Sequence, residues 1–250
     1  MSKEAPHQYY GVCQHPAMRR VLSCPITALV VHWAFQGMLQ MDRTELLFKV
    51  SVEAIVLTVV VVILLRFGAP PVRAVLVSAV ISHTVNLSIN GQFWVVLKHF
   101  GLVKHSPRQL QRYLSALCER IDAEPSIEYA AVYGSLARGK WKATSDLDVR
   151  LVRRAGTANG VRACWFVLRE RTRAFVRGFP LDVFVLDSHD RLGEMREDEP
   201  PVVLSHTTAV VHPLGTCSVS AAQQLATTDR ERNGPRSEED RNDWTEMTAQ

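Results

Sequence analysis

The stretch of sequence that decides the fold is YGSLARGKWKATSDLDVRLV, residues 133–152. It places Gly134-Ser135 directly after one apolar run, and Asp146 and Asp148 at the start of another. Successive side chains of a strand point to opposite faces, so two acids that lie two residues apart share one face. Neighbouring carboxylates repel each other, and a hard cation such as Mg²⁺, which binds carboxylate and phosphate oxygens, removes that cost. The spacing therefore predicts a metal-binding strand.

The sequence on either side of this stretch predicts an α/β (α+β) domain over residues 106–216, with a small mixed sheet and flanking helices. Apolar runs bounded by turn residues predict strands, and apolar residues at helical spacing predict helices. Asp187 and Ser188 are placed to cap a helix after the third strand. The expected elements are a helix from Ser106-Pro107 to about Ile121, strands Ile127–Tyr133 and Asp146–Val152, a helix Val161–Arg177, a strand Leu181–Leu186 and a candidate strand within Pro201–Val211.

A third acid, Asp182, lies within the apolar strand Leu181–Leu186, on the face that it shares with Phe184. If this strand is a neighbour of the strand that carries Asp146 and Asp148, the three carboxylates converge on one spot. The Gly-Ser pair that follows the first strand complements them. Glycine allows a close approach of the backbone, and the serine hydroxyl and the amides can hold a phosphate. The pattern therefore predicts a site for a metal ion and a phosphate.

This arrangement resembles the nucleotidyltransferase superfamily that includes DNA polymerase beta. It is most similar to the minimal bacterial and archaeal nucleotidyltransferase domains and to the aminoglycoside nucleotidyltransferases. The resemblance covers about residues 107–213. The motifs that carry it are Gly134-Ser135, Ala137-Arg138-Gly139, Ser145-Asp146-Leu147-Asp148 and, on a separate strand, Asp182.

The resemblance implies an enzyme that transfers a nucleoside monophosphate from an NTP, with ATP as the expected nucleotide, to an acceptor hydroxyl and releases pyrophosphate. It also implies two Mg²⁺ ions, one on the triphosphate and one that activates the acceptor hydroxyl. Asp182 would bind the second ion or act as general base on that hydroxyl. The implied metal ligands are Asp146, Asp148 and Asp182, and the implied nucleotide-binding residues are Gly134, Ser135 and Arg138.

Two functions fit such a domain. The first is an active nucleotidyltransferase anchored in a membrane, whose acceptor is a small molecule, a protein side chain or a lipid-linked sugar. The alternative is a regulatory, antitoxin-like nucleotidyltransferase module that modifies or binds a partner protein. A nucleic-acid polymerase or CCA-adding role is disfavoured. The net charge of +4 is modest, no template-binding domain is expected, and the basic residues form no groove interleaved with aromatic residues.

The first 105 residues differ sharply in composition from the rest of the chain. They hold four acids and nine Lys or Arg residues, whereas residues 106–228 hold 14 acids and 16 Lys or Arg residues. Charged side chains are costly in lipid, which explains a scarcity of acids in a membrane segment. The asymmetry predicts a membrane region at 1–105, ahead of the domain at 106–216 and a polar, disordered tail at 217–250.

The apolar stretches within this region predict a membrane hairpin of residues 46–66 and 73–98, joined by a turn that contains Gly and Pro. Residues 21–41 are a further span or an interfacial helix. Lys49 and Glu53, four residues apart, are expected to pair on one helix face near the end of the first span. A buried helical pair inside a soluble domain is the alternative, and the scarcity of acids favours the membrane.

His83, Asn86 and Asn90 lie within the second predicted span at helical spacing, and they therefore form a polar stripe on one face of that helix. Hydrogen bonding between helices is the favoured interpretation, and contact with a lipid headgroup or a lipid-linked substrate is the alternative. The basic residues after this span outnumber the two arginines in the turn. By the positive-inside rule, they predict a membrane protein whose C-terminal catalytic domain faces the cytoplasm. These residues are Lys98, Lys104, Arg108 and Arg112.

Overall fold

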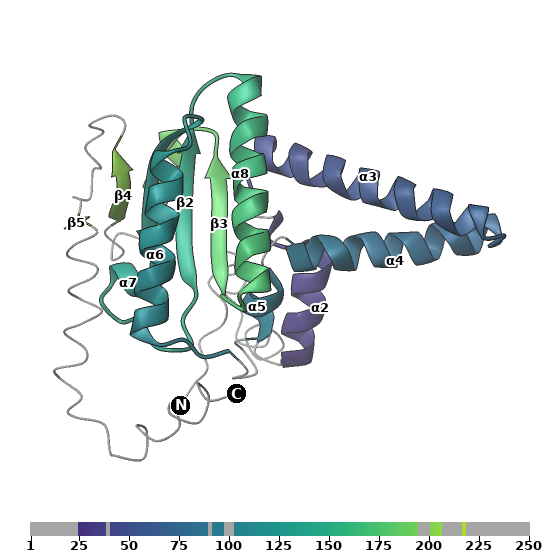
Figure 1. Cartoon of the computed structure of the whole chain (residues 1–250), viewed down its shortest axis with the longest axis horizontal. Coiled ribbons are helices and arrows are strands. Elements are labelled where there is room, and N and C mark those ends of the chain that lie inside the picture. Colours follow the sequence, from purple (N-terminus) through teal and green to yellow (C-terminus); the bar gives the residue numbers. More distant parts are fainter. Residues whose placement is uncertain are drawn as a thin grey trace, which may run out of the picture.

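The computed structural model describes residues 25–38, 41–89, 92–97, 103–194, 201–206 and 217–218. Its centre is a mixed sheet, and a long helical hairpin leaves the molecule on one side (Figure 1). β1 is antiparallel to β2 and β4, whereas β2 and β3 are parallel, as are β4 and β5. The predicted α/β fold with a small mixed sheet is confirmed. The strands are β1 Ile127–Tyr133, β2 Leu147–Arg153, β3 Leu181–Leu186, β4 Val202–His206 and β5 Cys217–Ser218, in the order β3-β2-β1-β4-β5.

The strands lie close to their predicted positions. β1 and β3 match the prediction at both ends, and β2 begins one residue later, so that Asp146 lies just ahead of it. β4 falls within the candidate segment 201–211. The two residues of β5 lie just beyond the predicted domain boundary at residue 216, so the sheet extends slightly into the segment assigned to the tail. Residues 219–250 of that tail lie outside the described residues.

Two helices, α6 Pro107–Asp122 and α8 Thr157–Val176, cover one face of the sheet (Figure 1). α6 begins at a capping box, which satisfies two backbone donors at once. Ser106 Oγ accepts a hydrogen bond from the backbone N–H of Gln109 at 3.2 Å, and Gln109 Oε1 accepts one from the N–H of Ser106 at 2.8 Å. α8 begins at Thr157, four residues before the predicted start.

The alternation of side chains along the strands divides the sheet residues between two faces. Leu147, Val149 and Leu151 of β2 pack into the main core beneath α6 and α8. The opposite face carries a smaller apolar cluster, which includes Tyr129, Tyr133 and Leu192. The last of these belongs to the 3₁₀ helix η4 His189–Glu194. The even-numbered acids of β2 and β3 are out of phase with the main core, and they therefore lie on this second face.

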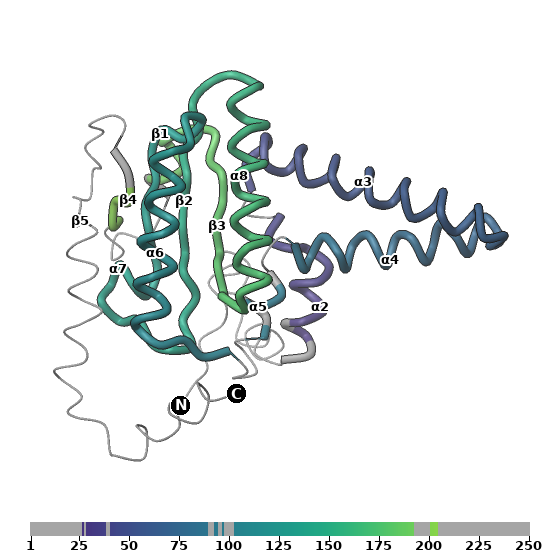
Figure 2. Tube along the Cα trace, in the orientation of Figure 1, coloured from purple at the N-terminus to yellow at the C-terminus, as the bar shows by residue number. Residues whose placement is uncertain are grey.

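The hairpin consists of α3 Arg43–Arg66 and α4 Pro71–Ile89, and it projects well beyond the sheet (Figures 1 and 2). Ala74, Ser78 and Ser82, each four residues apart on α4, are buried, and small residues of this kind let neighbouring helices approach closely. Both helices are long and apolar enough to cross a membrane. Hardly any of the most apolar part of α3 is buried, which differs from a core helix of a soluble domain.

The second helix of the hairpin is shorter than predicted. α4 ends at Ile89 instead of continuing to residue 98, and a separate short helix, α5 Gln92–Leu97, follows it. Trp94 of α5 donates its indole N–H to the carbonyl oxygen of Phe175 at 2.7 Å. The chain therefore packs against the end of α8 after the hairpin, and residues 92–97 of the predicted second segment 73–98 belong to α5.

The helix α2 Pro25–Phe35 lies within the segment 21–41 that was predicted as a further span or an interfacial helix. It has 11 residues, about half of the roughly 20 that a spanning helix needs. Its exposed side chains include Leu29, Val30 and Phe35, as expected for a helix that lies at an interface. Residues 21–24 and 39–40 lie outside the described residues.

The base of the hairpin is attached to β3, the edge strand of the sheet. Glu45 Oε2 accepts a hydrogen bond from the N–H of Val185 at 2.7 Å. Arg171 of α8 donates to Glu45 Oε1 at 2.6 Å and also to the carbonyl oxygen of Val183. An edge strand presents unpaired N–H and C=O groups, and these two side chains satisfy such groups in place of a further strand. The hairpin and the sheet domain therefore form one packed unit.

Asp187 takes part in the same attachment, which corrects the prediction that it caps a following helix. Its carboxylate accepts hydrogen bonds from Arg153 Nε at 2.7 Å and from the N–H of Thr44 at 3.3 Å. Burial alone would raise the pKa of Asp187, but the hydrogen bonds from Thr44 and Arg153 outweigh it and hold the pKa below its usual value. Arg153 of the neighbouring strand β2 and Thr44 of the hairpin thus hold the carboxylate away from the segment that follows it in the chain.

Candidate functional site

Three neighbouring strands bring the predicted site residues to one end of the sheet. β1 ends at Tyr133, and β2 and β3 begin close to Asp148 and Asp182. In the register of the sheet, Tyr133 lies beside Asp148, and Asp148 lies beside Asp182. Residues paired across adjacent strands project from the same face, so the two carboxylates are neighbours on the face opposite α6 and α8. β2 and β3 are thus adjacent strands, which is the condition on which the predicted convergence of the carboxylates depends.

Gly134 brings the backbone of the turn after β1 close to the carboxylate of Asp148. It is the first residue of the short helix α7 Gly134–Ala137 and has a φ of +73°, a conformation that L side chains rarely adopt. A Cβ atom at this position would lie only 2.0 Å from Asp148 Oδ2 and 3.0 Å from its Cγ. The absence of a side chain is therefore what allows the turn after β1 to pack directly against the carboxylate of Asp148.

This contact leads to a first prediction, for Gly134→Ala. We expect a loss of stability of about 1–2 kcal/mol from the left-handed backbone and a further loss of about 1–3 kcal/mol from the steric overlap with Asp148. The measurement is the free energy of unfolding in denaturant. Gly178→Ala is the matched control, because Gly178 has a φ of +65° and its added Cβ would meet only Trp94 at 3.9 Å. Equal losses for the two variants would contradict the predicted overlap.

Ser135 and Arg138 lie on the same tight turn. The N–H of Arg138 donates to the carbonyl oxygen of Gly134 at 3.2 Å, and the N–H of Lys140 donates to that of Ser135 at 2.8 Å. Ser135 is half-buried, and its Oγ atom is buried without a hydrogen-bond partner among the described residues. Arg138 ends the turn and is also half-buried. A buried hydroxyl that has unused hydrogen-bonding capacity beside this turn suits a phosphate oxygen.

The three predicted carboxylates differ in exposure. Asp182 is 4 % exposed, whereas Asp146 and Asp148 are half-buried. Asp146 follows a turn that is closed by Ser145, whose Oγ accepts a hydrogen bond from the N–H of Lys142 at 3.1 Å and whose own N–H donates to the Lys142 carbonyl at 2.8 Å. This turn fixes the chain immediately before β2, and Asp146 follows it directly, two residues ahead of Asp148.

Two residues of this face escaped the sequence analysis. Arg150 donates to the carbonyl oxygen of Asp182 at 3.3 Å, and its guanidinium lies over the ring of Phe184, 4.6 Å from the centroid. It therefore adds a positive charge close to the carboxylates. Tyr133 lies beside Asp148, and burial raises the pKa of its phenol. The two-residue period that relates Arg150 to Asp148 could have identified the arginine.

The donor chemistry of the site fits a hard divalent cation, because carboxylate oxygens are the ligands that Mg²⁺ prefers. Like charges at directly opposed positions of adjacent strands also repel, and a cation relieves that repulsion. Within the described part of the chain, however, no group of three or more His, Cys, Asp or Glu side chains is arranged to hold a metal ion. The magnesium site stays a prediction, with Asp148 and Asp182 as adjacent carboxylates and Asp146 as the third.

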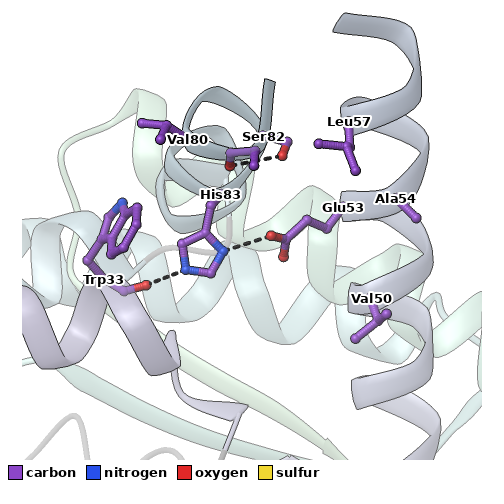
Figure 3. Close-up of a pocket in the computed structure, with 9 residues that line it drawn as sticks. Trp33, Val50, Glu53, Ala54, Leu57, Val80, Ser82 and His83 are labelled. Carbon is purple, nitrogen blue, oxygen red and sulfur yellow. Dashed lines mark hydrogen bonds and ion pairs between the residues drawn. The ribbon is translucent and has the colours of Figure 1, made fainter. Parts of the chain in front are cut away.

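A second polar cluster lies in the hairpin (Figure 3). His83 Nδ1 lies 2.7 Å from Glu53 Oε1, and His83 Nε2 lies 2.7 Å from the carbonyl oxygen of Trp33. Asn86 donates to the other oxygen of Glu53 at 2.8 Å. The two ring nitrogens of His83 therefore connect α4 to a carboxylate of α3 and to a backbone carbonyl of α2. The cluster borders a mainly apolar pocket of about 510 Å³ between α2, α3 and α4, whose lining includes none of the predicted site residues.

These contacts correct one prediction and confirm another. Lys49 and Glu53 do not pair with each other, because Lys49 Nζ donates to the carbonyl oxygen of Gln36 at 2.6 Å and Glu53 binds His83 and Asn86. Their spacing on α3 places them on one face, but Gln36, directly after α2, and the helix α4 supply the partners. Hydrogen bonding between helices, the favoured interpretation of the polar stripe, is confirmed for His83 and Asn86. Asn90 lies outside the described residues.

We compared the chain with protein-family models, curated proteins and solved structures. The chain matches no family model, no curated protein and no solved structure.

Proposed function

We propose that this protein is a membrane-anchored, Mg²⁺-dependent nucleotidyltransferase. It would move a nucleoside monophosphate from an NTP, with ATP as the first candidate, to an acceptor hydroxyl. The observation that carries the proposal is the contact of the Gly134 turn with the carboxylate of Asp148, which itself lies beside Asp182 in the register of the sheet. The resemblance of this motif to the polymerase beta-like nucleotidyltransferase superfamily supports the same reading.

The turn after β1 is the proposed binding place of the triphosphate. Gly134 has no side chain to keep the phosphates away from the backbone, and the buried hydroxyl of Ser135 is available to donate to a phosphate oxygen. Arg138, at the end of the same turn, adds a positive charge. These three groups would hold the nucleotide with its phosphates close to Asp148.

In the proposed reaction, the acceptor oxygen attacks the α-phosphorus of the nucleotide. The new O–P bond forms as the bond to the bridging oxygen of the departing pyrophosphate breaks. Asp182 would take the hydroxyl proton as general base, a role that its burial beside Asp148 suits. Asp146, Asp148 and Asp182 would hold Mg²⁺, which neutralises phosphate charge and lowers the pKa of a bound hydroxyl. Arg150 would offset the charge of the carboxylates when no nucleotide is bound.

The hairpin is the proposed membrane anchor. α3 and α4 are long and apolar enough to span, and their outer faces are exposed. The basic residues that follow the hairpin in the sequence favour a cytoplasmic position for the sheet domain, by the positive-inside rule. On this view, the enzyme works next to a membrane, on an acceptor whose identity the site residues leave open.

The experiment that tests this function follows a labelled phosphate. Membranes that contain the full-length protein are incubated with Mg²⁺ and an NTP labelled at either the α- or the γ-phosphate. We expect an acceptor labelled only from the α-position, and loss of that labelling in Asp146→Asn/Asp148→Asn and after chelation of Mg²⁺. A labelled partner protein in stoichiometric complex would favour the regulatory alternative. Transfer of the γ-label, or labelling unchanged in the double variant, would contradict the proposal.

A further inference from the structure

The sheet domain exposes large apolar side chains on a single helix. Among the described residues from 103 onward, the exposed large hydrophobic residues are Val161 and Trp165, each 53 % exposed, and Val176, which is 78 % exposed. All three belong to α8. At about 100° per residue, they fall within roughly 60° of the helix circumference. They therefore form one apolar strip on the outer side of α8.

Arginines line one side of this strip. Arg169, Arg162 and Arg173 follow on the adjacent part of the circumference, at about 80° to 120° from Val161, and their side chains are 48 %, 57 % and 42 % exposed. Arg177, directly after the helix, is also exposed. The single acid of α8, Glu170, is buried. The strip and these four arginines are called the α8 face below.

The acidic partners of these arginines are buried, and the α8 face is therefore positively charged on its outer side. Arg162 and Arg169 lie 2.6 and 3.8 Å from Glu124, and Arg173 pairs with Glu170. Both acids are buried, so they balance part of the charge from beneath, and the arginine side chains remain accessible from outside. An apolar strip with Trp beside arginines and without exposed acids on its helix is typical of helices that lie on an anionic lipid surface.

The direction of the hairpin places α8 next to the same membrane. Both hairpin helices contact α8, and the hairpin leaves the molecule on the side that α8 covers (Figure 1). α8 runs across the hairpin direction, as a helix parallel to the membrane plane would beside a spanning pair. The helix α2 lies on this side as well. A membrane crossed by α3 and α4 would therefore lie next to α8.

We propose that α8 lies in the headgroup region of an anionic bilayer, with Val161, Trp165 and Val176 in the apolar boundary and the arginines on lipid phosphates. The inference rests on the hairpin being inserted, but not on the transfer reaction. α8 contacts both hairpin helices and runs across their direction, and the arginines of the α8 face are complementary in charge to anionic headgroups. Both observations favour lipid over a protein partner as the occupant of the α8 face.

The test uses the full-length protein in nanodiscs of phosphatidylcholine, with or without phosphatidylglycerol, whose acyl chains are brominated near the headgroup. Bromine quenches only tryptophan that contacts lipid. Comparison of the wild type with Trp165→Phe isolates the emission of Trp165, and comparison with Trp141→Phe isolates a half-buried tryptophan of the sheet domain outside α8. We expect brominated lipid to quench Trp165 and not Trp141, more strongly with phosphatidylglycerol. Arg169→Gln/Arg177→Gln should remove that dependence on anionic lipid, and Lys140→Gln/Lys142→Gln, an equal charge change on the exposed loop before β2, should not.

Each other outcome has a distinct meaning. Quenching of Trp165 by aqueous acrylamide but not by brominated lipid would overturn the proposal, because α8 would then face water. Protection from both quenchers would also overturn it, in favour of a protein surface such as a second copy. If the quenching of Trp165 by brominated lipid is the same with and without phosphatidylglycerol and in the arginine variants, the proposed role of charge is overturned. Flotation of the nanodiscs reports separately whether the hairpin is inserted, and none of these readouts depends on transfer activity.

Discussion

Asp182→Asn is expected to lower kcat of the proposed transfer by about 10²- to 10⁴-fold, the usual contribution of a general base, while the protein stays folded. Asparagine has nearly the shape of aspartate but cannot accept the hydroxyl proton or hold a cation by charge. Because Gly134 and Ser135 lie on a different element from Asp182, the KM for the nucleotide should change much less than kcat. The measurement is steady-state release of pyrophosphate with the acceptor that the labelling experiment identifies.

The matched control for this variant is Asp190→Asn, which removes the same charge from an exposed position of η4. It should leave kcat unchanged. Thermal unfolding of both variants separates a loss of chemistry from a loss of structure, since Asp182 is almost fully buried. Full activity of Asp182→Asn, or a loss of activity that only follows a lower unfolding temperature, would remove Asp182 from the proposed mechanism.

Local sequence patterns predict the sheet and the arrangement of the acids well. The strands β1 and β3 are apolar runs with turn residues at their ends, so their limits are encoded within a few residues of each. The two-residue period of β2 places Asp148 opposite the core side chains regardless of what surrounds the strand. The neighbouring position of Asp182, by contrast, depends on strand order, which the sequence analysis could state only as a condition.

Contacts between distant segments could not be predicted in this way. Glu45 and Arg171 are separated by 126 residues, and nothing in the pattern around either one indicates the other. The same holds for Glu53, whose nearest basic neighbour in sequence is Lys49 but whose partner in the fold is His83. Helical spacing shows which residues share a face, whereas the packing of α2, α3 and α4 decides which of them meet.

The ion pair of Glu45 and Arg171 gives the largest expected effect on stability. Both side chains are 3 % exposed, so removing one charge leaves the other buried without its partner. For Glu45→Gln we expect a loss of about 3–5 kcal/mol in the free energy of unfolding. Glu128→Gln is the control, because its pair with His189 is about one-third exposed on both sides. It should cost less than about 1 kcal/mol.

The same variant also tests whether the hairpin protects the edge of the sheet. Glu45 accepts from the N–H of Val185, and Asp42 accepts from that of Asp187 at 2.8 Å, so the start of α3 and its N-cap residue cover two backbone donors along this edge. In Glu45→Gln, hydrogen exchange at Val185 should accelerate by more than at Val149, which lies inside the sheet on β2. Uniform acceleration of both amides would mean that the pair stabilises the whole domain without holding the hairpin on β3. Unchanged exchange at Val185, together with unchanged stability, would show that the edge is protected without this ion pair.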